Sequence, residues 1–150
     1  MSEKLKIYLD NCCLNRPFDM QSNEIIELET KAKLIIQQSI KDRELIMVSS
    51  FMIDSENLEN PFKNNSRIIN IFLQFASEYC SASEDILFEA KQFLNYGLKH
   101  KDSLHLACAI KSKCDYLLTT DKKFLNKNDI ISKIQIVNPI TFLLKIGDLL

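Results

Sequence analysis

Four acidic side chains in this sequence stand where a predicted strand ends or a predicted helix begins: Asp10, Glu56, Asp102 and Asp121. In an α/β sheet, ligands bind at the carboxyl ends of the strands, and carboxylates delivered there by separate segments converge. Such a cluster repels itself unless a cation lies in it, and hard oxygen ligands suit Mg²⁺ or Mn²⁺. The pattern therefore predicts a divalent metal site that could act on a phosphodiester.

Each of these acids, taken alone, also has a purely structural explanation. Asp102 would stabilise the first turn of a helix through the helix dipole. Asp121 and Asp10 could accept hydrogen bonds from loop amides, and Glu56 could be a solvated helical acid close to Asp54. From topology alone, the metal site and the structural explanation remain equally open.

The elements that must position the acids follow from hydrophobic periodicity. Short apolar runs predict strands, and longer stretches with an apolar stripe predict helices. A helix carrying Glu56 is expected to be capped by Ser49-Ser50, and Ser81–Glu84 reads as a capping box. The predicted strands are 5–9, 45–48, 115–119 and 134–137, and the other predicted helices are 25–41, 67–79, 81–96, 101–113 and 140–146. This alternation predicts a three-layer α/β/α fold with a mostly parallel sheet of four to five strands.

Length and composition narrow the class of protein. A chain of 150 residues predicts one domain over residues 1–150. No apolar run approaches a membrane span, and Met1-Ser2-Glu3-Lys4 lacks the apolar region of a signal peptide, so we expect a cytoplasmic protein without membrane contact. Five cysteines without a C-x-x-C pair indicate reduced thiols. With only two glycines, neither glycine-rich nucleotide-binding motif can be written.

Positive charge is concentrated near the acids although the net charge is −1. Arg16 follows Asp10, two lysines flank Asp102, and another two directly follow Asp121: Lys99, Lys101, Lys122 and Lys123. Cations placed in this way would attract phosphate while the acids hold metal.

Four segments of the chain resemble the PIN domain, a small nuclease fold found in VapC-type toxins. They are Tyr8-Leu9-Asp10-Asn11, the serine pair leading to Glu56, Asp102-Ser103-Leu104-His105-Leu106-Ala107, and Thr119-Thr120-Asp121-Lys122-Lys123-Phe124. The resemblance implies that Asp10, Glu56, Asp102 and Asp121 are the catalytic and metal-binding acids, with Asn11 and Thr120 as supporting polar groups. Asp54 offers a competing register for the middle acid, although Glu56 is the preferred one.

The same resemblance implies an Mg²⁺- or Mn²⁺-dependent endoribonuclease that hydrolyses RNA phosphodiester bonds. Metal held by the acids would lower the pKa of water and offset charge on the attacked phosphate. It further implies an antitoxin partner in a type II toxin–antitoxin pair, and a homodimer. The alternative is a catalytically silent PIN-like module that binds protein or RNA. His105 lies one turn beyond Asp102 and could reach the site, but a core histidine with satisfied hydrogen bonds is the preferred interpretation.

Overall fold

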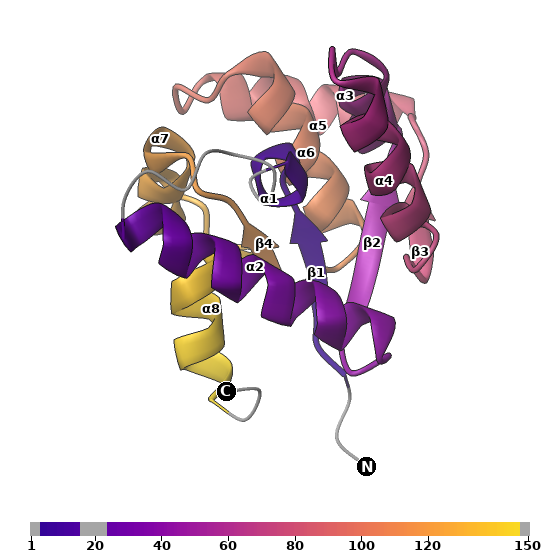
Figure 1. Ribbon diagram of the computed structural model, residues 1–150. Helices are drawn as coiled ribbons and strands as arrows, with labels where there is room; N and C mark the ends of the chain where they lie inside the picture. Colours follow the sequence, from indigo (N-terminus) through magenta and orange to yellow (C-terminus); the bar gives the residue numbers. More distant parts are fainter. Residues whose placement is uncertain (1–3, 16–23, 148–150) are drawn as a thin grey trace.

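The computed structural model describes residues 4–15 and 24–147, in which five strands form one parallel sheet (Figure 1). The order across the sheet is β3-β2-β1-β4-β5, so β1 lies at its centre. Because every pairing is parallel, the carboxyl ends of all five strands lie at one edge. The strands are β1 (Lys6–Leu9), β2 (Ile46–Ser50), β3 (Glu78–Cys80), β4 (Tyr116–Leu118) and β5 (Gln135–Val137).

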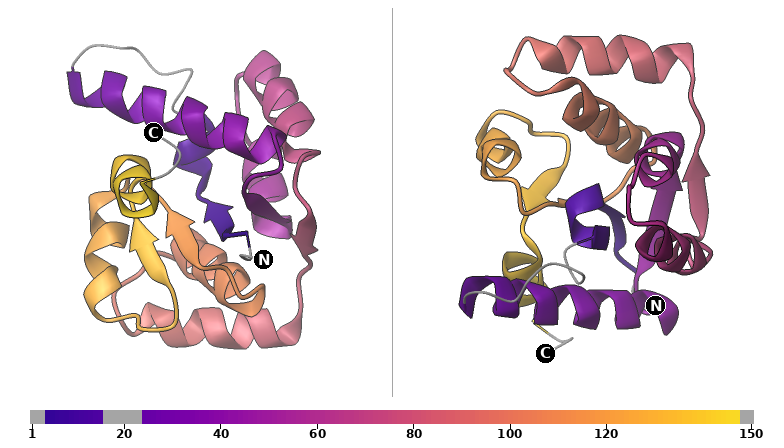
Figure 2. Two further views of the ribbon diagram at one scale, coloured as in Figure 1. Left: turned by 90° about the horizontal axis from the view of Figure 1, so that it is seen from below. Right: turned by 45° about the horizontal axis from the view of Figure 1, so that its top comes forward.

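Helices cover both faces of this sheet. Figure 2 shows α2 and α8 on one face and α5 and α6 on the other, which confirms the predicted three-layer α/β/α fold class. The helices are α1 (Asn11–Asn15), α2 (Glu24–Lys41), α3 (Phe51–Leu58), α4 (Lys63–Leu73), α5 (Glu84–Leu94), α6 (His100–Lys111), α7 (Lys122–Leu125), the 3-10 helix η2 (Asn126–Asp129) and α8 (Pro139–Ile146).

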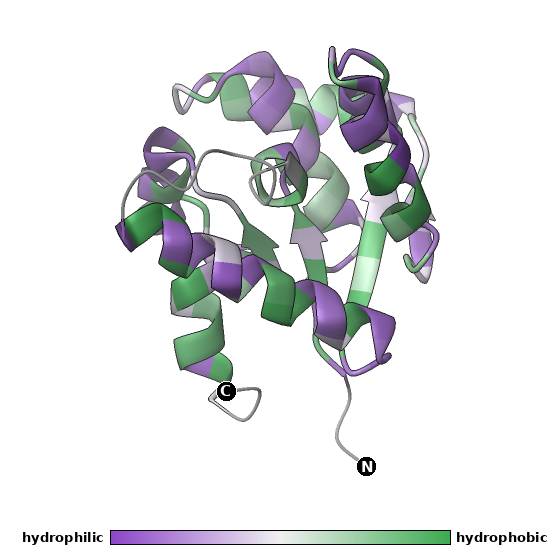
Figure 3. Ribbon diagram, viewed as in Figure 1, coloured by the Kyte–Doolittle hydropathy of each residue, from purple (hydrophilic) through white to green (hydrophobic). Residues whose placement is uncertain are grey.

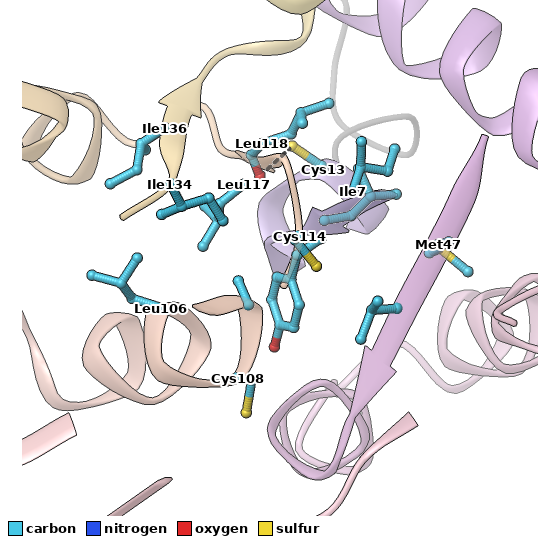
Figure 4. Close-up of a cluster of buried hydrophobic side chains, with 14 of the residues drawn as sticks. Ile7, Cys13, Met47, Leu106, Cys108, Cys114, Leu117, Leu118, Ile134 and Ile136 are labelled. Carbon is cyan, nitrogen blue, oxygen red and sulfur yellow. Dashed lines mark hydrogen bonds between the residues drawn. The ribbon is translucent and has the colours of Figure 1, made fainter. Parts of the chain in front are cut away.

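The core forms where β1 and β4 meet α6. Ile7 of β1 and Leu117 of β4 are fully buried, as strands covered on both faces require. Leu106 and Cys108 of α6 are also fully buried and belong to the same hydrophobic cluster, which Figure 4 draws. Figure 3 shows that α8 is hydrophobic over nearly its whole length, in keeping with its place against α2. The described residues contain no helix long and apolar enough to cross a membrane.

Side-chain caps mark several helix starts that the sequence predicts. The Ser50 hydroxyl accepts a hydrogen bond from the Ile53 amide (3.2 Å) at the start of α3. Asn138 caps α8 ahead of Pro139 at the first helical position. The predicted capping box over Ser81–Glu84 was wrong in its register, because Ser83 caps α5 and the helix begins at Glu84. These caps fix where each strand-to-helix connection turns.

One predicted helix was wrong at both ends. The segment expected to be helical over 67–79 forms α4 over Lys63–Leu73, and Tyr79 belongs to the edge strand β3. The apolar spacing continues through Phe75 and Ala76, which are partly buried against the core, so periodicity did not mark the end. β3 itself has three residues, two of them exposed, and gives no apolar run to detect.

Candidate metal centre

Asp10 directly follows the central strand β1 and is 7% exposed. Its Oδ1 accepts the Asn11 amide at 2.7 Å, and its Oδ2 accepts the Thr119 hydroxyl at 2.8 Å. The Cys12 thiol donates a longer bond of 3.5 Å to the same Oδ2. These donors fix a buried carboxylate at the middle of the carboxyl edge.

Glu56 reaches the same place from α3, which starts where β2 ends. Its carboxylate is hydrogen-bonded to His105 Nε2, and its side chain is 13% exposed. Asp54, the competing candidate, instead accepts the Tyr79 hydroxyl of β3 at 2.7 Å. The structure therefore places Glu56, and not Asp54, beside the other candidate acids.

His105 is fully buried in α6 and lies between the carboxylates. Its Nε2 contacts Glu56 and is 3.7 Å from Asp10 Oδ1, while its Nδ1 is 2.6 Å from the Tyr8 hydroxyl. Burial alone would lower the pKa of His105, but the Glu56 hydrogen bond and the Asp10 charge raise it above its usual value. His105 is the satisfied core histidine expected from the sequence, but two of the residues around it belong to the acidic cluster.

Asp10, Glu56 and His105 form a group whose potential ligand atoms all lie within 4.8 Å of one another. Two carboxylates this close in a largely buried position repel each other, and a divalent cation would remove that repulsion. The oxygen donors suit Mg²⁺ or Mn²⁺. The residues present therefore fit a divalent metal ion.

Asp102 stands in the first turn of α6, half-buried, three residues before His105 and outside this group of three. Burial, together with the negative charges of Asp10 and Asp121, raises the pKa of its carboxyl to about 6. Ser103, beside it, is buried, and within the described residues its hydroxyl has no hydrogen-bond partner.

Asp121 lies beyond β4 and caps the short helix α7. Its Oδ1 accepts the Lys123 amide at 2.9 Å. Asp121 therefore has the structural role that the sequence also allowed, as an acceptor for backbone amides. Its charge nevertheless acts on Asp102. The Asp121 amide donates to the Thr119 hydroxyl at 3.1 Å, and that hydroxyl donates to Asp10.

The supporting polar groups differ in part from the predicted ones. Thr119, which the sequence did not single out, supplies the hydroxyl that holds Asp10. The predicted Thr120 donates its amide to Cys12 Sγ at 3.3 Å. The predicted Asn11 contributes its amide to Asp10, and its side-chain Oδ1 is buried without a hydrogen-bond partner among the described residues.

Two lysines line a small pocket beside Asp102. Lys99 precedes α6 and Lys123 belongs to α7, and together with Asp102, Gly97, Leu98 and Phe124 they enclose about 120 Å³. Lys101 is directed elsewhere, since it pairs with Glu59 at 3.1 Å. Arg16, the cation nearest Asp10 in sequence, lies outside the described residues.

Comparison with known proteins supports the fold through solved structures. No family model matches the chain, and no curated protein matches it in sequence. One chain in the crystal structure of VapBC2 from Rickettsia felis bound to a DNA fragment from their promoter is 14% identical, with a TM-score of 0.56 over 89% of this chain and 98% of that one. One chain of VapBC-1 from nontypeable Haemophilus influenzae is 18% identical, with a TM-score of 0.54 over 90% and 98%. This likeness confirms the predicted PIN-like fold.

Proposed function

We propose that this chain is a metal-dependent endoribonuclease and the toxin of a type II toxin–antitoxin pair. The observation that carries the proposal is the meeting of Asp10, Glu56 and His105 within 4.8 Å at the carboxyl edge of the sheet, with Asp102 beside them. The likeness to VapBC structures supports the same assignment through the fold.

The four acids Asp10, Glu56, Asp102 and Asp121 would hold one or two Mg²⁺ or Mn²⁺ ions in this proposal. Such an ion supplies activation of water and neutralisation of charge on the attacked phosphate. The chain contributes the rest of the chemistry by placement: Thr119 and the Asn11 amide hold Asp10, and the carboxylate of Glu56 is held by His105. No side-chain nucleophile is required.

RNA is the proposed substrate because lysines that can bind phosphate lie beside the acids at the carboxyl edge of the sheet. Lys99 and Lys123 line the pocket next to Asp102, and no ion pair engages either among the described residues. A phosphate backbone is attracted by such lysines, and a single-stranded or looped segment can enter a narrow edge.

An antitoxin partner, a homodimer and a cytoplasmic location complete the proposal. Apolar side chains that a partner could cover are exposed on α2 and α8, and Leu28, Ile35 and Leu144 line a shallow groove of about 180 Å³ between these helices. Light scattering of the purified chain, alone and after co-expression with a neighbouring open reading frame, measures both assemblies.

The test is a time course of RNA cleavage with Mn²⁺ or Mg²⁺, comparing wild type with Asp102→Asn and with a chelator. The proposal expects cleavage that requires metal and is lost in Asp102→Asn. Equal activity in both proteins would reveal a contaminating ribonuclease. No cleavage of several RNAs by either would support the alternative, a catalytically silent module that binds protein or RNA.

A further inference from the structure

A continuous chain of buried hydrogen bonds runs behind the metal centre. The Tyr8 hydroxyl lies 2.7 Å from Ser50 Oγ and 2.6 Å from His105 Nδ1, and His105 Nε2 bonds Glu56. Tyr8, Ser50 and His105 are each fully buried. These hydrogen bonds join three elements that each carry or precede a candidate acid. Tyr8 is in β1, which precedes Asp10, and Ser50 caps the helix that carries Glu56. His105 is in α6, as Asp102 is.

The direction of the last bond in this chain is fixed by chemistry. A carboxylate can only accept, so the contact between Glu56 and His105 requires a proton on Nε2. A nitrogen that carries a proton has no lone pair for a metal ion. The contact to Glu56 is closer than the 3.7 Å separation from Asp10, so Nε2 is directed at the Glu56 oxygen.

The remaining donors then have defined places. In a neutral imidazole with its proton on Nε2, Nδ1 accepts the Tyr8 hydroxyl, and Tyr8 accepts the Ser50 hydroxyl. In a charged imidazole Nδ1 donates to Tyr8 instead, and Nε2 carries its proton in both forms. Ser50 also accepts the Ile53 amide at 3.2 Å. Contacts at both ring nitrogens, with Tyr8 at Nδ1 and Glu56 at Nε2, hold the imidazole in one orientation.

We propose that His105 is a positioning residue: its Nε2–H holds the Glu56 carboxylate for the metal, Tyr8 and Ser50 keep the ring in that orientation, and the ion is bound by carboxylate oxygens and not by the imidazole. This inference rests on the proposed function, because it assigns a role within the same metal centre. It agrees with the preference of Mg²⁺ for oxygen ligands. Partners that orient ligating carboxylates affect metal affinity about 10–100-fold.

Nitrogen-15 NMR of histidine-labelled protein tests the inference directly. The sequence has two histidines, and His100→Gln assigns the signals of His105. We expect Nε2 of His105 to be protonated without metal and to stay protonated when Mg²⁺ is added. Loss of the Nε2 proton on adding Mg²⁺, with the proton moved to Nδ1, would mean direct ligation and overturn the inference.

Calorimetric titration with Mg²⁺ alone gives a second readout. Tyr8→Phe removes one hydroxyl from the chain and should weaken Mg²⁺ binding by about 10-fold. Tyr116→Phe, on the adjacent strand, is the matched control and should leave binding unchanged. A Tyr8→Phe protein that melts lower but binds Mg²⁺ as wild type does would show a merely structural role and overturn the inference.

These measurements separate the inference from the proposed function because they contain no RNA. A wild type that keeps the Nε2 proton and binds Mg²⁺ but cuts no RNA would contradict the nuclease and support the positioning role. A wild type that cuts RNA but loses the Nε2 proton on binding Mg²⁺ would contradict the positioning role alone. A wild type that binds no Mg²⁺ would overturn both.

Discussion

Tyr79 donates a hydrogen bond of 2.7 Å to Asp54 and thereby ties that carboxylate to the edge strand β3. Glu56, two residues further along the same short helix, is directed at His105 instead. The bond also raises the pKa of Tyr79, for which burial is the larger cause, to about 12. The two acids of α3 therefore have different environments although the sequence makes them close alternatives.

Glu56→Gln and Asp54→Asn should separate these roles. Glu56→Gln removes a charge from the proposed metal centre, so we expect at least about a 10-fold loss of Mn²⁺ affinity. Asp54→Asn should bind Mn²⁺ as wild type does, because its carboxylate is engaged by Tyr79. Calorimetric titration of both variants measures the difference, and the reverse order of effects would make Asp54 the middle acid.

Asp102→Asn should stabilise the metal-free protein near neutral pH. The folded protein raises the pKa of this carboxyl to about 6, so the folded state binds more protons than the unfolded state between about pH 4 and 6, and its stability falls as pH rises through that window. Allowing for solvent screening of a half-buried group, the gain for Asn is on the order of 1 kcal/mol, or about 2–4 °C. Thermal melts in chelator should show this gain at pH 7.5 and little of it at pH 4. A variant less stable than wild type at pH 7.5 would contradict the raised pKa of Asp102.

Divalent metal should stabilise the folded chain. An ion that binds only the folded state at about 100 times its Kd adds roughly 2.7 kcal/mol, equivalent to about 5–10 °C here. Melting curves with Mn²⁺, with Mg²⁺ and with chelator measure the shift. The Asp10→Asn variant should lose most of it, and a wild type that melts at one temperature in all three conditions would count against the metal centre.

Lys99→Gln and Lys123→Gln should weaken RNA binding without altering metal binding. Each lysine lines the pocket beside Asp102, and each phosphate contact removed should lower the slope of log affinity against log salt by about 0.7 for a single strand. Fluorescence anisotropy with a labelled single-stranded RNA in chelator, which prevents cleavage, gives that slope. Lys133→Gln, which breaks an exposed ion pair with Glu89, is the control. Equal slopes in all three variants would mean that Lys99 and Lys123 do not contact the RNA phosphates.

Most of the fold could be predicted because its central strands and several helix starts have clear sequence patterns. The strands that became β1, β2, β4 and β5 are apolar runs that must be buried on both faces, and the caps at Ser50 and Asn138 mark helix starts. The edge strand β3 was not predicted, because an exposed strand of three residues contains no apolar run. It is held by its neighbour β2, a pairing between distant segments that periodicity does not report.

The site could be predicted only in part, for a related reason. Acids at strand ends follow from topology, but which groups hold them depends on side chains that meet across the sheet. Thr119 donates its hydroxyl to Asp10, although Thr120 was the predicted supporting group. Both threonines follow the last residue of β4, where strand alternation no longer says which side chain faces Asp10. The Tyr8–His105 bond joins residues 97 apart and leaves no trace in local pattern, although His105 shares a helix with Asp102.

The position of β1 at the centre of the sheet affects when the acidic site can form during synthesis of the chain. β1 is made first, yet Asp10 depends on a hydroxyl 109 residues later, and β4 supplies the neighbour that β1 requires on one side. Contacts of such long sequence separation form late, after their loops have closed. A ribosome must therefore finish most of this chain before the acidic edge exists.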